Sequence, residues 1–385
     1  MPADSSNSSL EPIVGAREAP QGPDAGLQGP AFGPAQGPIP ASGPSASCGV
    51  GDIGTIGSPL PSLAGQILPS PFFLAPVAGY SDAAFRSICF ELGAGICYTE
   101  MVSAEALVRN NRKTEVLMEK SEAETRYAIQ LFGANPDSLA KAAERASRLN
   151  PLAIDLNCGC PVPKIVKSGA GSALLRNPKL LGEIVKAMVG ASPVPITVKI
   201  RKGWDEASVN YRETALAAVE AGATAVTLHG RTRAQGYSGS ADWAAIADLA
   251  ALLASAGIPV FGSGDAFDAE SSLKMLLTTG VRGVMIARGA MGNPFVFAQA
   301  KALWLGKAYD EPTPALIAEI ATRHLSRAAQ FMGEDTACRE YRKHFCAYSK
   351  GLPGGADLRN RAVRCSSLRE FFEIIGSVTK IVLNN

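Results

Sequence analysis

The chain has 385 residues, of which 46% are hydrophobic and 19% are charged, a composition typical of a globular protein with one large domain and additional segments. Its formal net charge of +2 is too small to indicate a nucleic-acid-binding protein, so any basic surface has to be local. Apolar runs fall short of the roughly 18 residues that a membrane-spanning helix needs, and the first residues lack the basic and apolar regions of a secretory signal. We therefore expect a cytoplasmic protein without a membrane partner, its cysteines reduced.

Residues 1–65 are rich in Pro, Gly, Ser and Ala and contain a single basic residue, Arg17. They show neither a helical nor a strand-like period. Such a composition cannot bury enough apolar surface to fold, so the sequence predicts a disordered extension of unassigned function.

From residue 72 onward, short apolar runs alternate with stretches of helical period. Asp82 and Pro136 are typical residues at the beginning of helices, and glycines follow several of the helical stretches. Repeated strand–helix units favour a closed (β/α)8 TIM barrel over residues 66–309, although a doubly wound open sheet accepts the same alternation. The expected strands are residues 72–76, 95–100, 127–132, 152–157, 195–200, 225–230, 258–263 and 283–288.

Polar residues near the carboxyl ends of these strands favour the barrel over the open sheet. In a TIM barrel, the carboxyl ends of all strands surround one active site. A single site is therefore expected to receive side chains from seven strands. These residues are Glu100, Gln130, Asn157 with Cys160, Lys199, His229, Ser263 and Arg288.

The segment 155–161, DLNCGCP, is the strongest single indication of chemistry. Gly159 allows a tight bend and Pro161 restricts the backbone before it, so Cys160 is expected to be held in a defined position. Paired cysteines can also bind a metal or fill a core, but a second nearby pair is missing. We expect no metal, a functional Cys160 and a packing role for Cys158.

Lys199 lies near the end of its strand between apolar neighbours, where an ammonium group needs a partner. Two roles stay open for it: a Schiff base with a carbonyl substrate, or a contact with the ring of a reduced flavin. His229, followed by Arg231 and Arg233, is either a satisfied structural histidine or a functional group. The amide of Gln130 can pair with a ring edge that has both donors and acceptors, as can that of Asn157.

The segments 261–265 and 287–294, FGSGD and ARGAMGNP, follow the last two expected strands and are rich in glycine. Backbone N–H groups in such loops, together with the cation Arg288, are typical of phosphate sites in barrels. Plain strand-to-helix turns can have the same composition, so these loops alone do not establish a phosphate site.

Residues 310–385 lack strand signals and predict a small all-helical C-terminal domain. Between residues 323 and 369, ten Lys or Arg residues outnumber four acidic residues. A basic helical appendage on an enzyme barrel favours a polyanionic partner.

Taken together, these motifs resemble the tRNA-dihydrouridine synthase family of bacterial type. Val77 and Ser263 stand where the family usually has methionine and often asparagine. The matching segments, in family order, are residues 74–86, 98–107, 130–136, 155–175, 197–204, 228–243, 262–265, 287–295 and, in the helical RNA-binding domain, 340–354.

The resemblance implies an oxidoreductase that reduces the 5,6 double bond of selected uridines in tRNA, with FMN as cofactor and NADPH as reductant. Cys160 would be the proton donor, and the protein would be a monomer with a tRNA-binding domain at residues 310–385. FMN would be bound by Pro76, Val77, Ala78, Gln130, Lys199, His229, Ser263, Gly264, Asp265, Ala287 and Arg288. Substrate would be bound by Asn157, Arg231, Arg233, Arg342 and Lys343.

Three other functions are compatible with part of the sequence. A flavin barrel that acts on a free pyrimidine would have no use for the basic helical segment. An aldolase would use Lys199 as a Schiff base and would contain no flavin. A catalytically idle RNA-binding protein would not require Cys160. The sequence leaves open which uridine is reduced.

Overall fold

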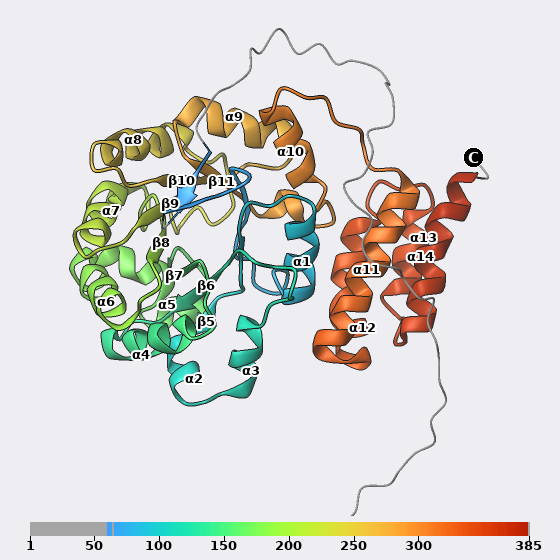
Figure 1. Cartoon of the computed structure of the whole chain (residues 1–385), viewed down its shortest axis with the longest axis horizontal. Helices are drawn as coiled ribbons and strands as arrows, with labels where there is room; N and C mark the ends of the chain where they lie inside the picture. Colours follow the sequence, from blue (N-terminus) through green and yellow to red (C-terminus); the bar gives the residue numbers. More distant parts are fainter. Residues whose placement is uncertain (1–59, 64, 384–385) are drawn as a thin grey trace, which may run out of the picture. The chain divides into compact units, whose positions relative to one another are not determined.

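The computed structural model describes residues 60–63 and 65–383, and in them eight parallel strands close into a barrel (Figure 1). Neighbouring strands pair in chain order, β11 pairs with β3, and β4 pairs with β6. The predicted TIM barrel is therefore confirmed, and the open sheet is wrong. The strands are β3 (Phe72–Leu74), β4 (Cys97–Tyr98), β6 (Tyr127–Phe132), β7 (Ala153–Cys158), β8 (Ile196–Arg201), β9 (Ala225–His229), β10 (Val260–Ser263) and β11 (Gly283–Ile286).

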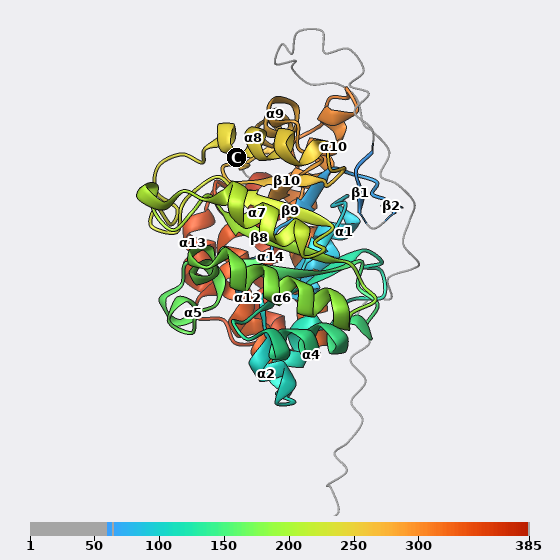
Figure 2. The same cartoon turned by 90° about the vertical axis from the view of Figure 1, so that its left-hand side faces the viewer.

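Helices between the strands form the outer layer of the barrel, and Figure 2 shows α6 and α7 lying across β8 and β9. As predicted, Asp82 caps the first of these helices, its carboxylate accepting a hydrogen bond from the Phe85 amide, and Pro136 begins another. The helices are α1 (Ala83–Glu91), α4 (Pro136–Ser147), α6 (Pro178–Ala191), α7 (Tyr211–Glu220), α8 (Trp243–Ala254), α9 (Ala269–Thr279) and α10 (Val296–Trp304).

One further short strand and several short helices lie in the loops of the barrel. Strand β5 (Val102–Ser103) pairs with the end of β6, and the helices α2 (Ala104–Val108) and α3 (Arg112–Glu115) follow it. Helix α5 (Pro163–Lys167) begins directly after the loop that carries the predicted functional cysteine. The 3-10 helices are η1 (Val116–Met118), η2 (Gly171–Arg176), η3 (Glu206–Ser208) and η4 (Arg288–Ala290).

Large apolar side chains fill the barrel interior. The rings of Phe73 and Phe261 meet edge to face at 5.0 Å between centroids. Leu63 of β1 (Ser62–Leu63), which pairs in antiparallel fashion with β2 (Gln66–Ile67), belongs to the same cluster, as does Leu68 directly after β2. Residues 62 and 63 lie in the predicted disordered extension but form a strand, because the Leu63 side chain packs against the apolar interior of the barrel. Residues 1–59 and 64 of that predicted extension lie outside the described residues.

The C-terminal part is helical, as predicted: α11 (Pro314–Met332), α12 (Glu334–Tyr348), α13 (Gly355–Ala362) and α14 (Leu368–Leu383). Ile320, Leu325 and Phe345 belong to an apolar cluster of their own, which also includes Ile88 of α1. The turn before α10 approaches α12 so closely that a Cβ on Gly292 would overlap the Ala347 carbonyl. Within the described residues, no helix is both long and apolar enough to cross a membrane.

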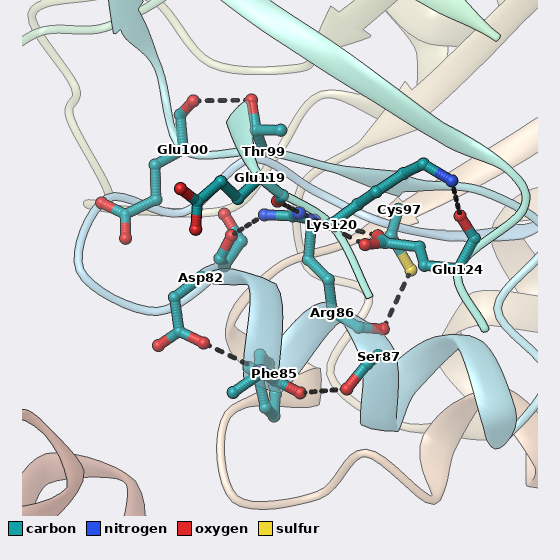
Figure 3. A network of polar contacts seen from close by, with 12 residues as sticks. Asp82, Phe85, Arg86, Ser87, Cys97, Thr99, Glu100, Glu119, Lys120 and Glu124 are labelled. Carbon is teal, nitrogen blue, oxygen red and sulfur yellow. Dashed lines mark hydrogen bonds and ion pairs between the residues drawn. The ribbon is translucent and has the colours of Figure 1, made fainter. Parts of the chain in front are cut away.

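A buried ion pair supports the loop between β3 and α1 (Figure 3). Arg86 and Glu124 are almost entirely buried, with 2.9 Å between Nε and Oε1. The same guanidinium donates to the carbonyl of Ser81 at 3.0 Å and to that of Glu119. Burial raises the pKa of Glu124, and Arg86 opposes the rise. The arginine therefore stabilises the charged form of this buried carboxylate.

Candidate active site

A cavity lies where the barrel strands end, and most of the predicted site residues line it. The predicted residues in its wall are Pro76, Val77, Ala78, Gln130, Asn157, Cys160, Lys199, His229, Ser263, Gly264, Asp265, Ala287 and Arg288. The cavity also has lining residues that the sequence analysis did not select, among them Met101, Arg201, Tyr237, Phe267 and Met291.

A chain of hydrogen bonds connects a buried acid to the loop of Cys160. The Gln130 side chain donates from Nε2 to the Asp155 carboxylate at 2.7 Å and accepts at Oε1 from Nδ2 of Asn157, also at 2.7 Å. Oδ1 of Asn157 then accepts from the backbone N–H groups of Gly159, at 3.2 Å, and Cys160, at 2.9 Å. Because Asp155 accepts and the cysteine loop donates, both amides are fixed in one orientation.

Arg201 holds the same loop from the other side. Its guanidinium donates to the carbonyls of Gly159 at 2.8 Å, Thr232 at 2.9 Å and Gly236 at 2.8 Å. It thereby ties the loop after β7 to the loop after β9. Burial raises the pKa of the Cys160 thiol, although Arg201 and other nearby groups oppose the rise, so the thiol is protonated at neutral pH.

Lys199 lines the cavity, and Asp155 lies on the neighbouring strand. Burial lowers the pKa of Lys199 to about 8, with Arg201 adding to the decrease and Asp155 opposing it. Burial raises the pKa of Asp155 to about 6, against hydrogen bonds from Gln130 and from the Thr197 hydroxyl at 2.6 Å. At neutral pH the lysine is mostly charged, which suits the binding of an anionic group.

The pKa of His229 indicates the sign of the charge around the cavity. Burial lowers its pKa well below the ordinary range, and the cations Lys199, Arg201, Arg231 and Arg288 lower it further. The ring is therefore neutral, and the cavity carries a positive electrostatic potential. Such a cavity favours an anionic ligand.

The loops after β10 and β11 pack against each other at the far wall. Gly264 has φ 111°, and a Cβ there would lie 2.8 Å from Cδ2 of His229. A Cβ on Gly289 would lie 2.6 Å from the Phe267 carbonyl oxygen. Glycine at 289 therefore allows the loop after β11 to approach the backbone of the loop after β10, and glycine at 264 allows the loop after β10 to approach the His229 ring in the cavity wall.

Arg288 and Tyr237 form the mouth of the cavity. The guanidinium carbon of Arg288 lies 5.1 Å from the ring centroid of Tyr237 and 4.8 Å from that of Phe267. Arg288 also lies 3.4 Å from an oxygen of Asp265, whose second cationic neighbour is Arg231 at 2.8 Å. Tyr237 is 61% exposed, so an aromatic side chain of the cavity wall is accessible to solvent.

Four predicted substrate-binding residues lie outside the cavity wall. Arg231 is buried, with its guanidinium committed to the Ser238 and Gly239 carbonyls and to Asp265. This placement favours a structural role. The other three are partly buried: Arg233 stacks on Trp204, Arg342 donates to the Cys365 carbonyl, and Lys343 pairs with Glu340.

Glu100, which was expected at the common site, accepts a hydrogen bond from the Gly79 amide at 2.6 Å instead of lining the cavity. It supports the turn that carries Ala78. Cys158 is fully buried in the outer core, as predicted. The unpredicted contributors Asp155 and Arg201 had one signal in the sequence: a charged residue inside an otherwise apolar strand.

Comparison with known proteins agrees with this geometry. The profile of the family described as dihydrouridine synthase (Dus) matches residues 73–382. The chain belongs to the dihydrouridine synthase family. The resemblance read from the sequence is thus confirmed, and because dihydrouridine synthases are oxidoreductases, so is the predicted enzyme class.

Curated dihydrouridine synthases match over most of their length. A probable tRNA-dihydrouridine synthase of Treponema pallidum is 48% identical over 79% of this chain and 91% of its own. A probable tRNA-dihydrouridine synthase of Mycobacterium tuberculosis is 42% identical over 76% of this chain and 78% of its own. The tRNA-dihydrouridine synthase B of Pseudomonas aeruginosa is 39% identical over 79% of this chain and 93% of its own.

Proposed function

We propose that this chain reduces the 5,6 double bond of uridines in tRNA, with FMN as its cofactor and NADPH as the reductant. The observation that carries the proposal is one cavity in which a protonated, positioned thiol, Cys160, faces cationic glycine-rich loops. The names of the curated relatives support tRNA as the substrate.

The residues of the cavity fit FMN. Gly264 lines the cavity next to Ser263 and Asp265, and Arg288 is a cation in the same wall, so we assign this wall to the phosphate. The neutral His229 and the charged Lys199 would then contact the ring and ribityl region, and Gln130 the pyrimidine edge. FMN, kept reduced by NADPH, supplies the hydride for ring carbon 6 of uracil.

Cys160 completes the reduction by giving its thiol proton to ring carbon 5, so that one hydride and one proton saturate the double bond. A thiol keeps its proton at neutral pH, where an ordinary carboxylic acid has lost it. The thiolate left behind faces Arg201 and Lys199, which stabilise its charge until solvent returns the proton. Asn157 keeps the cysteine loop in position throughout.

The target base has to leave its stack to reach this cavity, and the exposed ring of Tyr237 at the mouth offers an aromatic face to a nucleic acid. Asn157 borders the same cavity and is assigned to the base. We assign tRNA binding to the basic residues of 310–385, with Arg342 and Lys343 among them, and to the loop of Arg233. We also propose that residues 66–309 and 310–385 are two domains, because most residues of the second apolar cluster come from the C-terminal helices. The enzyme is further proposed to be cytoplasmic and monomeric.

The experiment is a reduction assay on tRNA from a strain that lacks its own synthases. Purified protein should be yellow and should raise dihydrouridine in that tRNA when NADPH is supplied. The Cys160→Ala variant should keep its flavin and lose most turnover, whereas Cys346→Ala, which removes a partly buried thiol outside the cavity, should keep both.

A protein that purifies without flavin and does not bind added FMN contradicts the proposal. Reduction of free uracil without reduction of tRNA supports the pyrimidine oxidoreductase instead. A Cys160→Ala variant with full turnover contradicts the assignment of the proton donor alone. The position of dihydrouridine along the RNA, read in the same sample, identifies the target uridine.

A further inference from the structure

Two of the three histidines of the chain, His324 of α11 and His344 of α12, lie together with Asp82, the capping residue of α1. One nitrogen from each ring and one carboxylate oxygen all lie within 4.8 Å of one another. None of the three residues lines the active-site cavity. The group therefore has no part in the proposed reaction.

The two rings are buried and short of partners. His324 is 0% exposed and His344 is 2% exposed. Nε2 of His324 and both ring nitrogens of His344 make no hydrogen bond to any described residue. The separation of 3.6 Å between Nε2 of His344 and Oδ2 of Asp82 is too long for a good hydrogen bond. Buried polar atoms normally have partners, so these nitrogens indicate a missing group.

Two polar atoms of the group have hydrogen-bond partners, and these bonds leave the other polar atom of the same side chain available. Oδ1 of Asp82 accepts from the Phe85 amide at 2.8 Å, which leaves Oδ2 available. Nδ1 of His324 is paired with the Tyr348 hydroxyl at 3.2 Å, which leaves Nε2 available. Ligands of bound metals are typically oriented by such outer hydrogen bonds.

We propose that Asp82, His324 and His344 bind a divalent transition-metal ion, with Zn²⁺ as the ion that the donor set fits best. Two imidazoles and one carboxylate suit Zn²⁺, whereas Mg²⁺ and Ca²⁺ prefer oxygen ligands throughout. Tetrahedral coordination with metal–ligand distances of about 2.0–2.1 Å places ligand atoms about 3.3 Å apart. The observed separations reach this spacing with small side-chain movements.

A water molecule would take the fourth position, because no other Cys, His, Asp or Glu of the described residues joins the group. Asp82 is 19% exposed on its side chain and provides the entry for solvent and ion. One ion at this point would join the beginning of α1 to both α11 and α12. The site is therefore structural, and its occupancy would stabilise the contact between the barrel and the C-terminal helices.

The test is a Zn²⁺ titration of the full-length flavoprotein, purified without a histidine tag and treated with a chelator. The wild type should bind one equivalent, and its melting temperature should rise with Zn²⁺. Asp82→Asn, in which asparagine can still cap α1, and His344→Gln should each bind at least tenfold more weakly and lose the rise in melting temperature. The control Cys346→Ala removes a partly buried thiol of α12 that belongs neither to the group nor to the cavity, and it should bind like the wild type.

X-ray absorption spectroscopy of the zinc-loaded wild type tests the ligands without any variant. We expect nitrogen and oxygen neighbours at about 2.0–2.1 Å and no sulfur at about 2.3 Å. A wild type that binds no Zn²⁺ overturns the proposal, as does a sulfur neighbour, which would indicate binding at cysteines. Equal binding by the wild type and Asp82→Asn overturns it too.

Discussion

Asp155 makes the stability of this protein depend on pH in a direction that a surface aspartate would not produce. Its pKa is raised by burial from an ordinary value of 3.8 to about 6. The folded protein therefore holds this proton more tightly than the unfolded chain does. The resulting stabilisation is fully present below about pH 3.8 and is lost as the pH rises through about 6.

The size of the effect follows from the change in pKa. At about 1.4 kcal/mol for each tenfold change in proton affinity, the whole effect amounts to about 3 kcal/mol. Between pH 4.5 and 7.5, proton linkage assigns about 2 kcal/mol of that loss to Asp155. Replacing Asp155 by Asn removes the titrating group, so the unfolding free energy of the wild type minus that of the variant should fall by this amount.

The measurement is urea unfolding at several pH values in that range, with FMN in excess, for the wild type and Asp155→Asn. Titrating groups that do not interact with Asp155 cancel in the difference, and Lys199, which does interact with it, has a pKa of about 8 and titrates mostly above this range. Thr197→Val is the matched comparison: it keeps Asp155 but removes a hydrogen bond that lowers its pKa, so its stability should continue to fall above pH 6. A difference between wild type and Asp155→Asn that does not change with pH refutes the reasoning.

Two further substitutions test the loop and the buried ion pair. Gly264→Ala places a Cβ on a residue with φ 111° and against the His229 ring. We expect the free energy of unfolding in urea to fall by about 1–3 kcal/mol and FMN to bind more weakly in a fluorescence titration. Unchanged FMN affinity would contradict the phosphate assignment. Arg86→Met leaves the Glu124 carboxylate buried without its partner, so the free energy of unfolding should fall by about 3–5 kcal/mol. Adding Glu124→Gln to the same chain should restore part of this stability. No recovery would mean that lost packing, and not the unpaired charge, causes the loss.

The strands and the common site could be predicted because both follow from local patterns. Apolar runs set the strand positions to within a few residues, and chain order in a parallel barrel brings the strand ends together. The side chains of Gln130, Lys199 and His229 therefore meet at one cavity, although they are far apart in the sequence. Glu100 fits the same pattern, but its carboxylate accepts a hydrogen bond from the Gly79 amide and does not line the cavity.

Side-chain partners in the loops could not be predicted in the same way. Arg231 follows His229 directly and reads as a substrate contact, yet loop packing buries its guanidinium against Asp265 and backbone carbonyls. Arg201 reads as the end of a strand, and its three carbonyl partners come from two loops. The expectation of no metal rests on the cysteines and stays untested; the cluster proposed above could not be found from spacing, because most of the folded chain separates Asp82 from His324.

The contact between Gly292 and Ala347 restricts how this chain can be recombined with its relatives. Gly292 has φ 73°, and any side chain there would enter the space of the Ala347 backbone. A barrel from one parent and C-terminal helices from another can therefore join only if the parent of the barrel has glycine at this point. In a library of chimeras with crossovers between residues 292 and 347, barrels without glycine at position 292 should be depleted whichever parent supplies the C-terminal helices, even though more than fifty residues separate the two positions.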